Sequence, residues 1–169
     1  AFHVGMDEVF ILGDADCPRC KGHDHAELFA AQVNALHDHL VRERKVEMFM
    51  WADRLLDAKA MHYSKWEAAT NGTAPAVARI PHDIVLCDWH YEGHSFPSLA
   101  YLTGKGLRVW PCGWHDVNAA EALIDASLAL KSPLIVGYLS TTWGKSPLDQ
   151  LAEFPPTKLA IQKLSVHGP

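Results

Sequence analysis

Two adjacent carboxylates, Asp7 and Glu8, stand at the end of an apolar run that opens the chain. Paired carboxylates suit acid/base chemistry, because one group can donate a proton while its neighbour stays ionised. On its own, such a pair at the end of a strand is more often the solvated start of a loop. The residues at the ends of the other strands therefore decide the interpretation.

A second group of reactive side chains follows in the next loop, where Cys17, Cys20, His23 and His25 are closely spaced. Thiolate and imidazole ligands at this spacing could hold a tetrahedral zinc ion. A disulfide or redox pair is one alternative, and free thiols are another. Such a zinc ion would have a structural role and would stabilise the loop beside the carboxylates. No cofactor is expected to be required for catalysis.

Five apolar runs have the length of strands, and helical patterns separate them. The runs cover residues 1–6, 46–51, 84–87, 107–112 and 134–139. Alternating strands and helices predict a parallel sheet with right-handed crossovers. Because the runs are almost wholly apolar, both faces of this sheet are expected to be covered.

Capping signals and helical spacing predict the helices. Asp24 and Glu27 form a capping box that opens a helix up to Arg44. A longer region of helical character follows the second strand, through Trp66 to the break at Asn71 and Gly72. The other expected helix starts are Pro97, a capping box of Asn118 and Glu121, and the segment of Ser146, Pro147 and Asp149.

The strand ends distinguish a barrel from an open sheet. No glycine-rich phosphate loop follows the first strand, which argues against a dinucleotide-binding fold. All five strand ends carry Asp, Glu, Trp, His or Thr instead, as the carboxyl face of a TIM barrel does. A complete barrel has eight strands and typically about 250 residues. The chain of 169 residues therefore predicts an α/β fold, a partial TIM (β/α)8-type barrel in one domain, residues 1–169.

The run at residues 3–8, His-Val-Gly-Met-Asp-Glu, resembles the His, any, Gly, Gly, Asp, Glu motif on the fourth barrel strand of family 20 glycoside hydrolases, the β-N-acetylhexosaminidases. Trp51, Trp89 and Trp143 resemble the tryptophans at the ends of strands five, six and eight that wall the sugar subsite. The resemblance covers most of the chain, as strands four to eight of that barrel. Met6 replaces the second glycine of the motif, and the tyrosine expected near the end of strand seven is not evident.

The resemblance implies removal of terminal N-acetylhexosamine by substrate-assisted retaining hydrolysis, in which the substrate's own 2-acetamido oxygen attacks the anomeric carbon. Glu8 would protonate the leaving oxygen and later deprotonate water, with a pKa raised by partial burial and by its anionic neighbour. Asp7 would accept the acetamido N–H and stabilise the oxazolinium-like intermediate.

The remaining candidate residues would bind the substrate. The tryptophans would stack on the apolar face of the sugar, although such side chains can also simply cap a core. His3 would support the carboxylates from behind. The full set of substrate-binding candidates is His3, Trp51, Asp53, Trp89, Trp114 and Trp143.

Composition limits the partners. A net charge of -5 leaves no basic stripe for a phosphate backbone, so a carbohydrate substrate, an N-acetylhexosaminide, is expected rather than nucleic acid. No apolar run approaches the roughly 20 residues of a membrane span, and no leader precedes the first strand. Since the chain begins inside an apolar run, we expect a fragment or processed product, and both cytoplasmic and secreted locations stay open.

Two other functions remain alternatives. A catalytically silent carbohydrate-binding or scaffold half-barrel would pair with another chain, as a homo-oligomer or as part of a larger chain, because its outer strands need covering. A metal-dependent hydrolase would instead use the Cys and His residues of the loop after Glu8.

Overall fold

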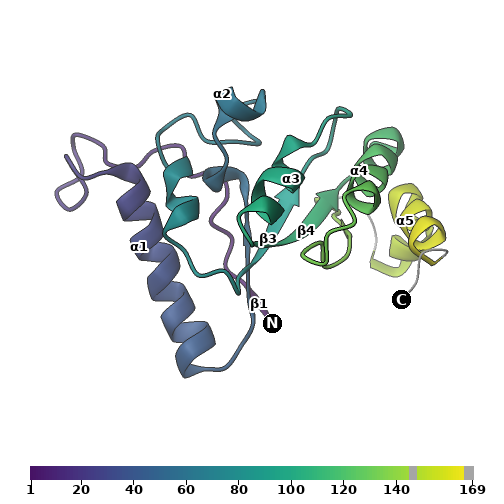
Figure 1. Ribbon diagram of the computed structural model, residues 1–169, viewed down its shortest axis with the longest axis horizontal. Helices are drawn as coiled ribbons and strands as arrows, with labels where there is room; N and C mark the ends of the chain where they lie inside the picture. Colours follow the sequence, from purple (N-terminus) through teal and green to yellow (C-terminus); the bar gives the residue numbers. More distant parts are fainter. Residues whose placement is uncertain (145–147, 166–169) are drawn as a thin grey trace. The chain divides into compact units, whose positions relative to one another are not determined.

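The computed structural model describes residues 1–144 and 148–165 (Figure 1). The chain divides into two compact units, Ala1–Cys87 (unit 1) and Asp88–Pro169 (unit 2). Parallel strands follow the chain order β1-β2-β3-β4-β5 in the sheet, with helices between them along the chain. This arrangement confirms the α/β class and the five strands expected from the sequence.

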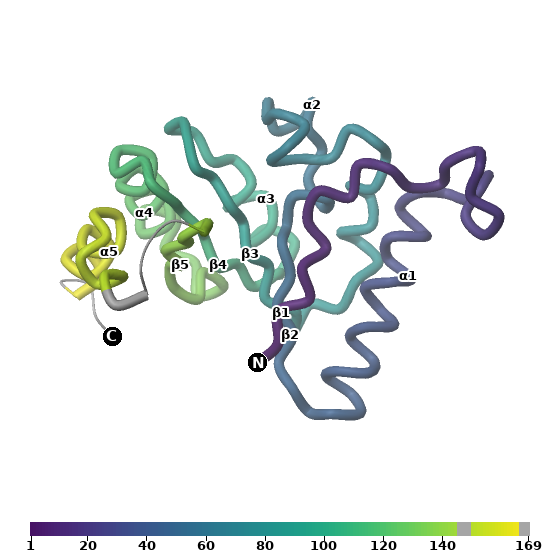
Figure 2. The backbone as a smooth tube through the Cα atoms, turned by 180° about the vertical axis from the view of Figure 1, so that it is seen from behind, coloured from purple at the N-terminus to yellow at the C-terminus, as the bar shows by residue number. Residues whose placement is uncertain are grey.

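In unit 1, β1 (Phe2–His3) and β2 (Met48–Trp51) run side by side, as Figure 2 shows. The next strand, β3 (Val85–Trp89), pairs with β2. β1 is shorter than the expected run 1–6, because Gly5 and Met6 have positive φ angles that end the extended backbone. Pairing nevertheless continues, since the N–H of Trp51 donates to the carbonyl of Gly5 at 3.0 Å.

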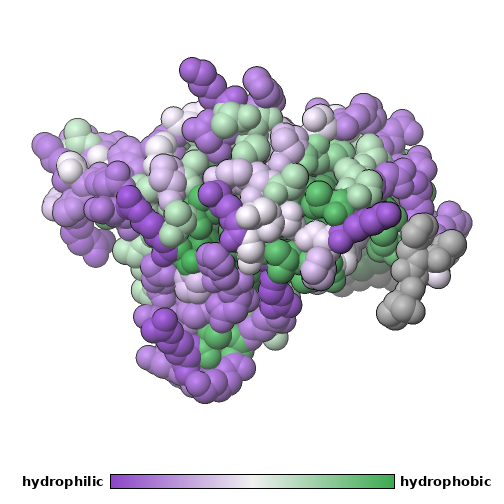
Figure 3. Space-filling view, viewed as in Figure 1, coloured by the Kyte–Doolittle hydropathy of each residue, from purple (hydrophilic) through white to green (hydrophobic). Residues whose placement is uncertain are grey.

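The first helix begins where the sequence predicts. The side chain of Asp24 accepts a hydrogen bond from the backbone N–H of Glu27 at 2.7 Å and caps α1 (His25–His37). A π-type turn region, η1 (Asp38–Glu43), continues it to the expected end. Phe29 and Val33, one turn apart, are buried, as an amphipathic helix requires. Hydrophilic residues, drawn purple, predominate on the face of α1 and η1 that Figure 3 presents.

The helical region expected after β2 is mostly wrong. The structure has only η2 (Asp53–Leu55) and α2 (Ala58–Met61) before Trp66, with η3 (Ala74–Ala78) further on. The buried guanidinium of Arg54 explains this, because its Nη2 donates to the carbonyls of Lys65, Trp66 and Ala68. These carbonyls are held in an irregular loop by a side chain rather than by helical hydrogen bonds.

Unit 2 carries helices on its strands. Both α3 (Pro97–Gly104) and α4 (Val117–Ala129) pack against β4 (Arg108–Gly113), and α3 begins at Pro97 as predicted. A short η4 (Leu148–Glu153) leads into the last helix, α5 (Pro155–Ser165), which packs on α4 and on β5 (Leu139–Ser140). No helix within 1–144 or 148–165 is long and apolar enough to cross a membrane.

Two predictions in unit 2 need correction. The cap of α4 is Asp116, which accepts from the N–H groups of Asn118 and Ala119, so the capping box predicted at Asn118 is wrong. The strand expected over 134–139 is interrupted at Gly137, which has a φ of 143°, a conformation that favours glycine. Before Gly137, the expected strand makes a single isolated β-bridge, between Val109 and Ile135. The expected cap residues Ser146 and Pro147 lie outside the described residues.

Candidate functional site

Asp7 and Glu8 lie on a turn that follows directly from β1 in unit 1. Gly5, Met6 and Glu8 have φ angles of 74°, 72° and 51°, all in the left-handed region that favours glycine. The turn leaves both carboxylates exposed to solvent. The partial burial expected for Glu8 is therefore not found in the described chain.

Buried Asp53 binds the backbone of this turn. Its exposed fraction is only 2%, and its Oδ2 accepts a hydrogen bond from the backbone N–H of Glu8 at 2.9 Å. The same oxygen accepts from Nε of Arg54 at 2.6 Å, in a fully buried ion pair. Asp53 was expected to bind substrate. In the structure its carboxylate instead binds the backbone of Glu8 and fixes the position of that residue. Arg54 was missed, although an Arg directly after an Asp at a strand end was a visible signal.

His3 and Trp51 form a ring pair at the ends of the two paired strands. Their ring centroids are 4.7 Å apart with planes tilted by 58°. Nδ1 of His3 accepts a hydrogen bond from the N–H of Gly5 at 3.1 Å. His3 thus contacts the turn that carries the carboxylates, and its part in substrate binding stays a prediction.

In unit 2, three predicted tryptophans meet at a tyrosine that the sequence analysis did not single out. Tyr91 stacks on Trp89 at 5.0 Å and meets Trp114 edge to face at 5.4 Å. Its hydroxyl accepts a hydrogen bond from Nε1 of Trp143 at 2.9 Å. These four residues, the aromatic cluster, follow the ends of β3, β4 and β5. Strand alternation was the missed signal, because Tyr91 lies two residues beyond Trp89 and so on the same face.

A buried polar network lies on the opposite face of the same strand end. The hydroxyl of Ser98, on α3, donates to Oδ2 of Asp88 at 2.6 Å and lies 3.0 Å from Nε2 of His90. Nε2 of His90 is also 3.2 Å from Oδ1 of Asp88, and all three residues are at most 1% exposed. A hydroxyl buried in this way is not placed to attack a substrate. The network instead fixes the strand that presents Trp89 and Tyr91.

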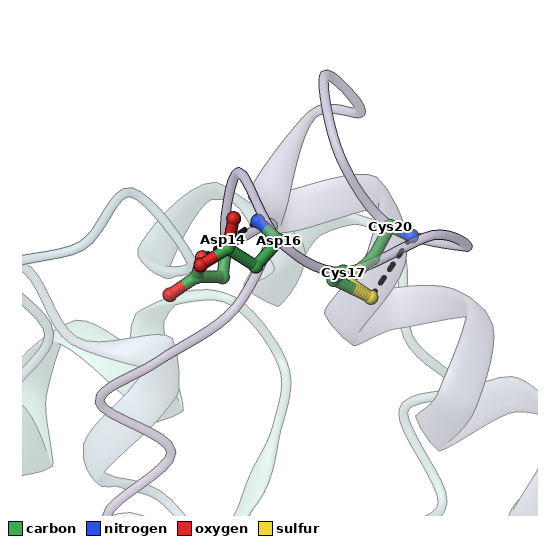
Figure 4. Close-up of a disulfide and its surroundings, with 4 residues drawn as sticks. All are labelled: Asp14, Asp16, Cys17 and Cys20. Carbon is green, nitrogen blue, oxygen red and sulfur yellow. Dashed lines mark hydrogen bonds between the residues drawn. A yellow bond between two sulfur atoms is a disulfide. The ribbon is translucent and has the colours of Figure 1, made fainter.

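The loop with the predicted zinc ligands contains a disulfide between Cys17 and Cys20 (Figure 4). The N–H of Cys20 also donates to Sγ of Cys17 at 3.2 Å, and His25 contacts the carbonyl of Asn71 through Nδ1. In the part of the chain that the structure describes, no three His, Cys, Asp or Glu side chains lie together as metal ligands would. The zinc site, with His23 as its fourth ligand, stays a prediction that this arrangement does not support.

Comparison with known proteins gives no match to a family model and no match among curated proteins. The function therefore has to be argued from the chemistry of the two groups, the carboxylate turn of unit 1 and the aromatic cluster of unit 2.

Proposed function

We propose that this chain is the part of a family 20-like β-N-acetylhexosaminidase barrel that runs from strand four to strand eight, and that it removes terminal N-acetylhexosamine with retention of configuration. The expected partial TIM barrel and its carbohydrate substrate belong to this proposal. The five parallel strands in chain order are compatible with it.

One observation carries the proposal, the backbone of the turn at Gly5 and Met6. The family motif has two glycines at these positions, and glycine is the residue that adopts positive φ without strain. Both residues have positive φ, at 74° and 72°, although one of them is a methionine. Met6 adopts this conformation in spite of its strain. The strain supports the proposal that the turn is shaped to expose Asp7 and Glu8 to a substrate.

The two exposed carboxylates would divide the work. Glu8 would protonate the glycosidic oxygen as the substrate's acetamido oxygen attacks the anomeric carbon, and would then take a proton from the attacking water. Asp7 would accept the acetamido N–H and stabilise the positive charge of the cyclic intermediate. Asp53 fixes the backbone N–H of Glu8, so it is a positioning residue.

The aromatic cluster of unit 2 would by itself offer a surface on which a sugar ring can stack. Trp89, Trp114 and Trp143 present large apolar surfaces, and Tyr91 holds them together. Apolar sugar faces stack well on such rings.

The test compares two substrates that differ only at C2, 4-nitrophenyl N-acetyl-β-D-glucosaminide and 4-nitrophenyl β-D-glucoside. Substrate assistance needs the acetamido group, so the first should be hydrolysed at least about 100-fold faster. Asp7→Asn should lower kcat on the first by about 100-fold, and Asp16→Asn, an exposed carboxylate of the following loop, should not. Equal rates on the two sugars, or no turnover of either, would overturn the proposal.

A silent scaffold that pairs with another chain is the second candidate, and the outermost strand favours it. β1 stands first in the strand order of the sheet, and Phe2 on it is 57% exposed. Exposed strand edges tend to recruit a further strand. A stable monomer in light scattering would argue against such pairing.

A further inference from the structure

Two aromatic rings lie exposed just beyond the catalytic carboxylates, in unit 1. Phe10 is 37% exposed and Trp66 is 48% exposed, and their rings meet edge to face with centroids 5.0 Å apart. Together the two rings form an exposed apolar patch, a feature that ligand-binding surfaces share. We refer to Phe10 and Trp66 as the aromatic platform.

The platform is held by buried Arg54, the ion-pair partner of the Asp53 that positions Glu8. The guanidinium carbon of Arg54 lies 5.0 Å from the centre of the Phe10 ring, and Nη2 of Arg54 donates to the carbonyl of Trp66 at 2.9 Å. Arg54 also pairs with Asp53, whose carboxylate accepts from the N–H of Glu8. One rigid set of contacts therefore links the proposed proton donor to both rings.

A third anchor fixes the segment between Glu8 and Phe10. The side-chain amide of Asn71 donates to the carbonyl of Val9 at 2.8 Å and to that of Phe10 at 3.3 Å. The hydroxyl of Thr73 donates to the carbonyl of Arg54 at 2.8 Å and lies 3.1 Å from the amide oxygen of Asn71. The backbone that carries Phe10 is thus as firmly held as the turn before it.

We propose that the aromatic platform binds the ring on the leaving-group side of the scissile bond, the next sugar of an N-acetylglucosamine oligosaccharide. This inference rests on the proposed function, in which Glu8 protonates the oxygen of the leaving group. That group must lie beside Glu8 when the proton is transferred, and Phe10 stands two residues further on. Stacking on the platform favours substrates with a ring at this position over those with a small alkyl group.

The test measures calorimetric affinities of Glu8→Gln, which should not turn over, for two ligands with the same terminal sugar. N,N'-diacetylchitobiose carries a second sugar ring, and methyl N-acetyl-β-D-glucosaminide carries only a methyl group. The disaccharide should bind about tenfold more tightly. Adding Trp66→Leu or Phe10→Leu should reduce this ratio to about one without changing the affinity for the methyl glycoside, which also reports that the variant is folded. Ile11→Ala, at a neighbouring residue that is 76% exposed, is the matched control and should keep the ratio.

Each other result has a distinct meaning. Equal affinities of the two ligands, or a ratio that persists in both Leu variants, would overturn the platform and leave the proposed function standing. Binding of neither ligand would overturn the proposed function, and the platform with it.

Discussion

The carboxylate of Asp53 accepts a hydrogen bond from the backbone N–H of Glu8, 45 residues earlier in the chain, at 2.9 Å. Because the same oxygen is paired with the buried Arg54, the position of the proposed proton donor depends on a charge pair in the core of unit 1. The same buried ion pair therefore affects both the stability of unit 1 and the position of the turn that carries Asp7 and Glu8.

Breaking the ion pair of Asp53 and Arg54 should strongly destabilise the folded state. Asp53→Asn leaves the charge of Arg54 buried without a counter-ion and should lower the free energy of unfolding by about 3–5 kcal/mol. The double variant Asp53→Asn with Arg54→Met removes both charges and should be less destabilised than the sum of the two single variants. Urea denaturation of the four proteins measures this. Additive losses would mean that the two side chains do not interact as the structure shows.

The turn at Met6 should favour glycine. Met6→Ala and Met6→Gly lose the same contacts beyond Cβ, but only Gly escapes the cost of positive φ. We expect Met6→Gly to be more stable than Met6→Ala by about 1 kcal/mol. Ala31→Gly, on the exposed face of α1, should show the opposite sign with a loss of about 1 kcal/mol. A Gly variant less stable than the Ala variant at position 6 would contradict the left-handed turn.

The buried hydroxyl of Ser98 should matter more than that of another buried serine. Ser98→Ala leaves Asp88 and His90 without their shared partner and should cost about 1–3 kcal/mol. Near-ultraviolet circular dichroism should change as well, because the network fixes the strand end that carries Trp89 and Tyr91. Ser127 is also buried, but among the described residues its hydroxyl bonds only to the carbonyl of Leu123 in its own helix, so Ser127→Ala should have little effect. Equal losses for the two variants would contradict a special role for the network.

Tyr138 should make the protein sensitive to alkali. Its hydroxyl is buried without a hydrogen-bond partner among the described residues, and burial, with a smaller contribution from Cys112, raises the pKa of its phenol. The unfolded phenol ionises near about pH 10, so above that pH the folded state binds more protons and its stability falls as the pH rises. Urea unfolding from about pH 9 to 11 should show a steeper loss for the wild type than for Tyr138→Phe. Parallel pH profiles would contradict the raised pKa.

Local patterns in the sequence were enough to predict much of the fold. Apolar runs gave the five strands and their order, and the capping box at Asp24 and the proline at Pro97 gave two helix starts. The loop through Trp66 could not be predicted, because its carbonyls bind Arg54, and no local pattern reveals which distant groups a buried guanidinium will reach.

The candidate site divides in the same way. The place of Asp7 and Glu8 at a strand end follows from residue types and the strand pattern, whereas their exposure does not, because partial burial was expected for Glu8. The positioning role of Asp53 and the central place of Tyr91 in the aromatic cluster depend on contacts between segments far apart in the chain. Such contacts follow from packing, which a single sequence does not encode in any short motif.

The most direct test of Glu8 as the proton donor is the dependence of kcat/KM on the leaving group. N-acetyl-β-D-glucosaminides of phenols with rising pKa would be assayed with the wild type, with Glu8→Gln and with Asp16→Asn as the control. A strongly acidic phenol leaves without a proton, so Glu8→Gln should affect it little, whereas a weakly acidic phenol should react about 100- to 10,000-fold more slowly in that variant. Asp16→Asn should follow the wild type across the series. An equal loss for every leaving group in Glu8→Gln, or no loss at all, would contradict the account.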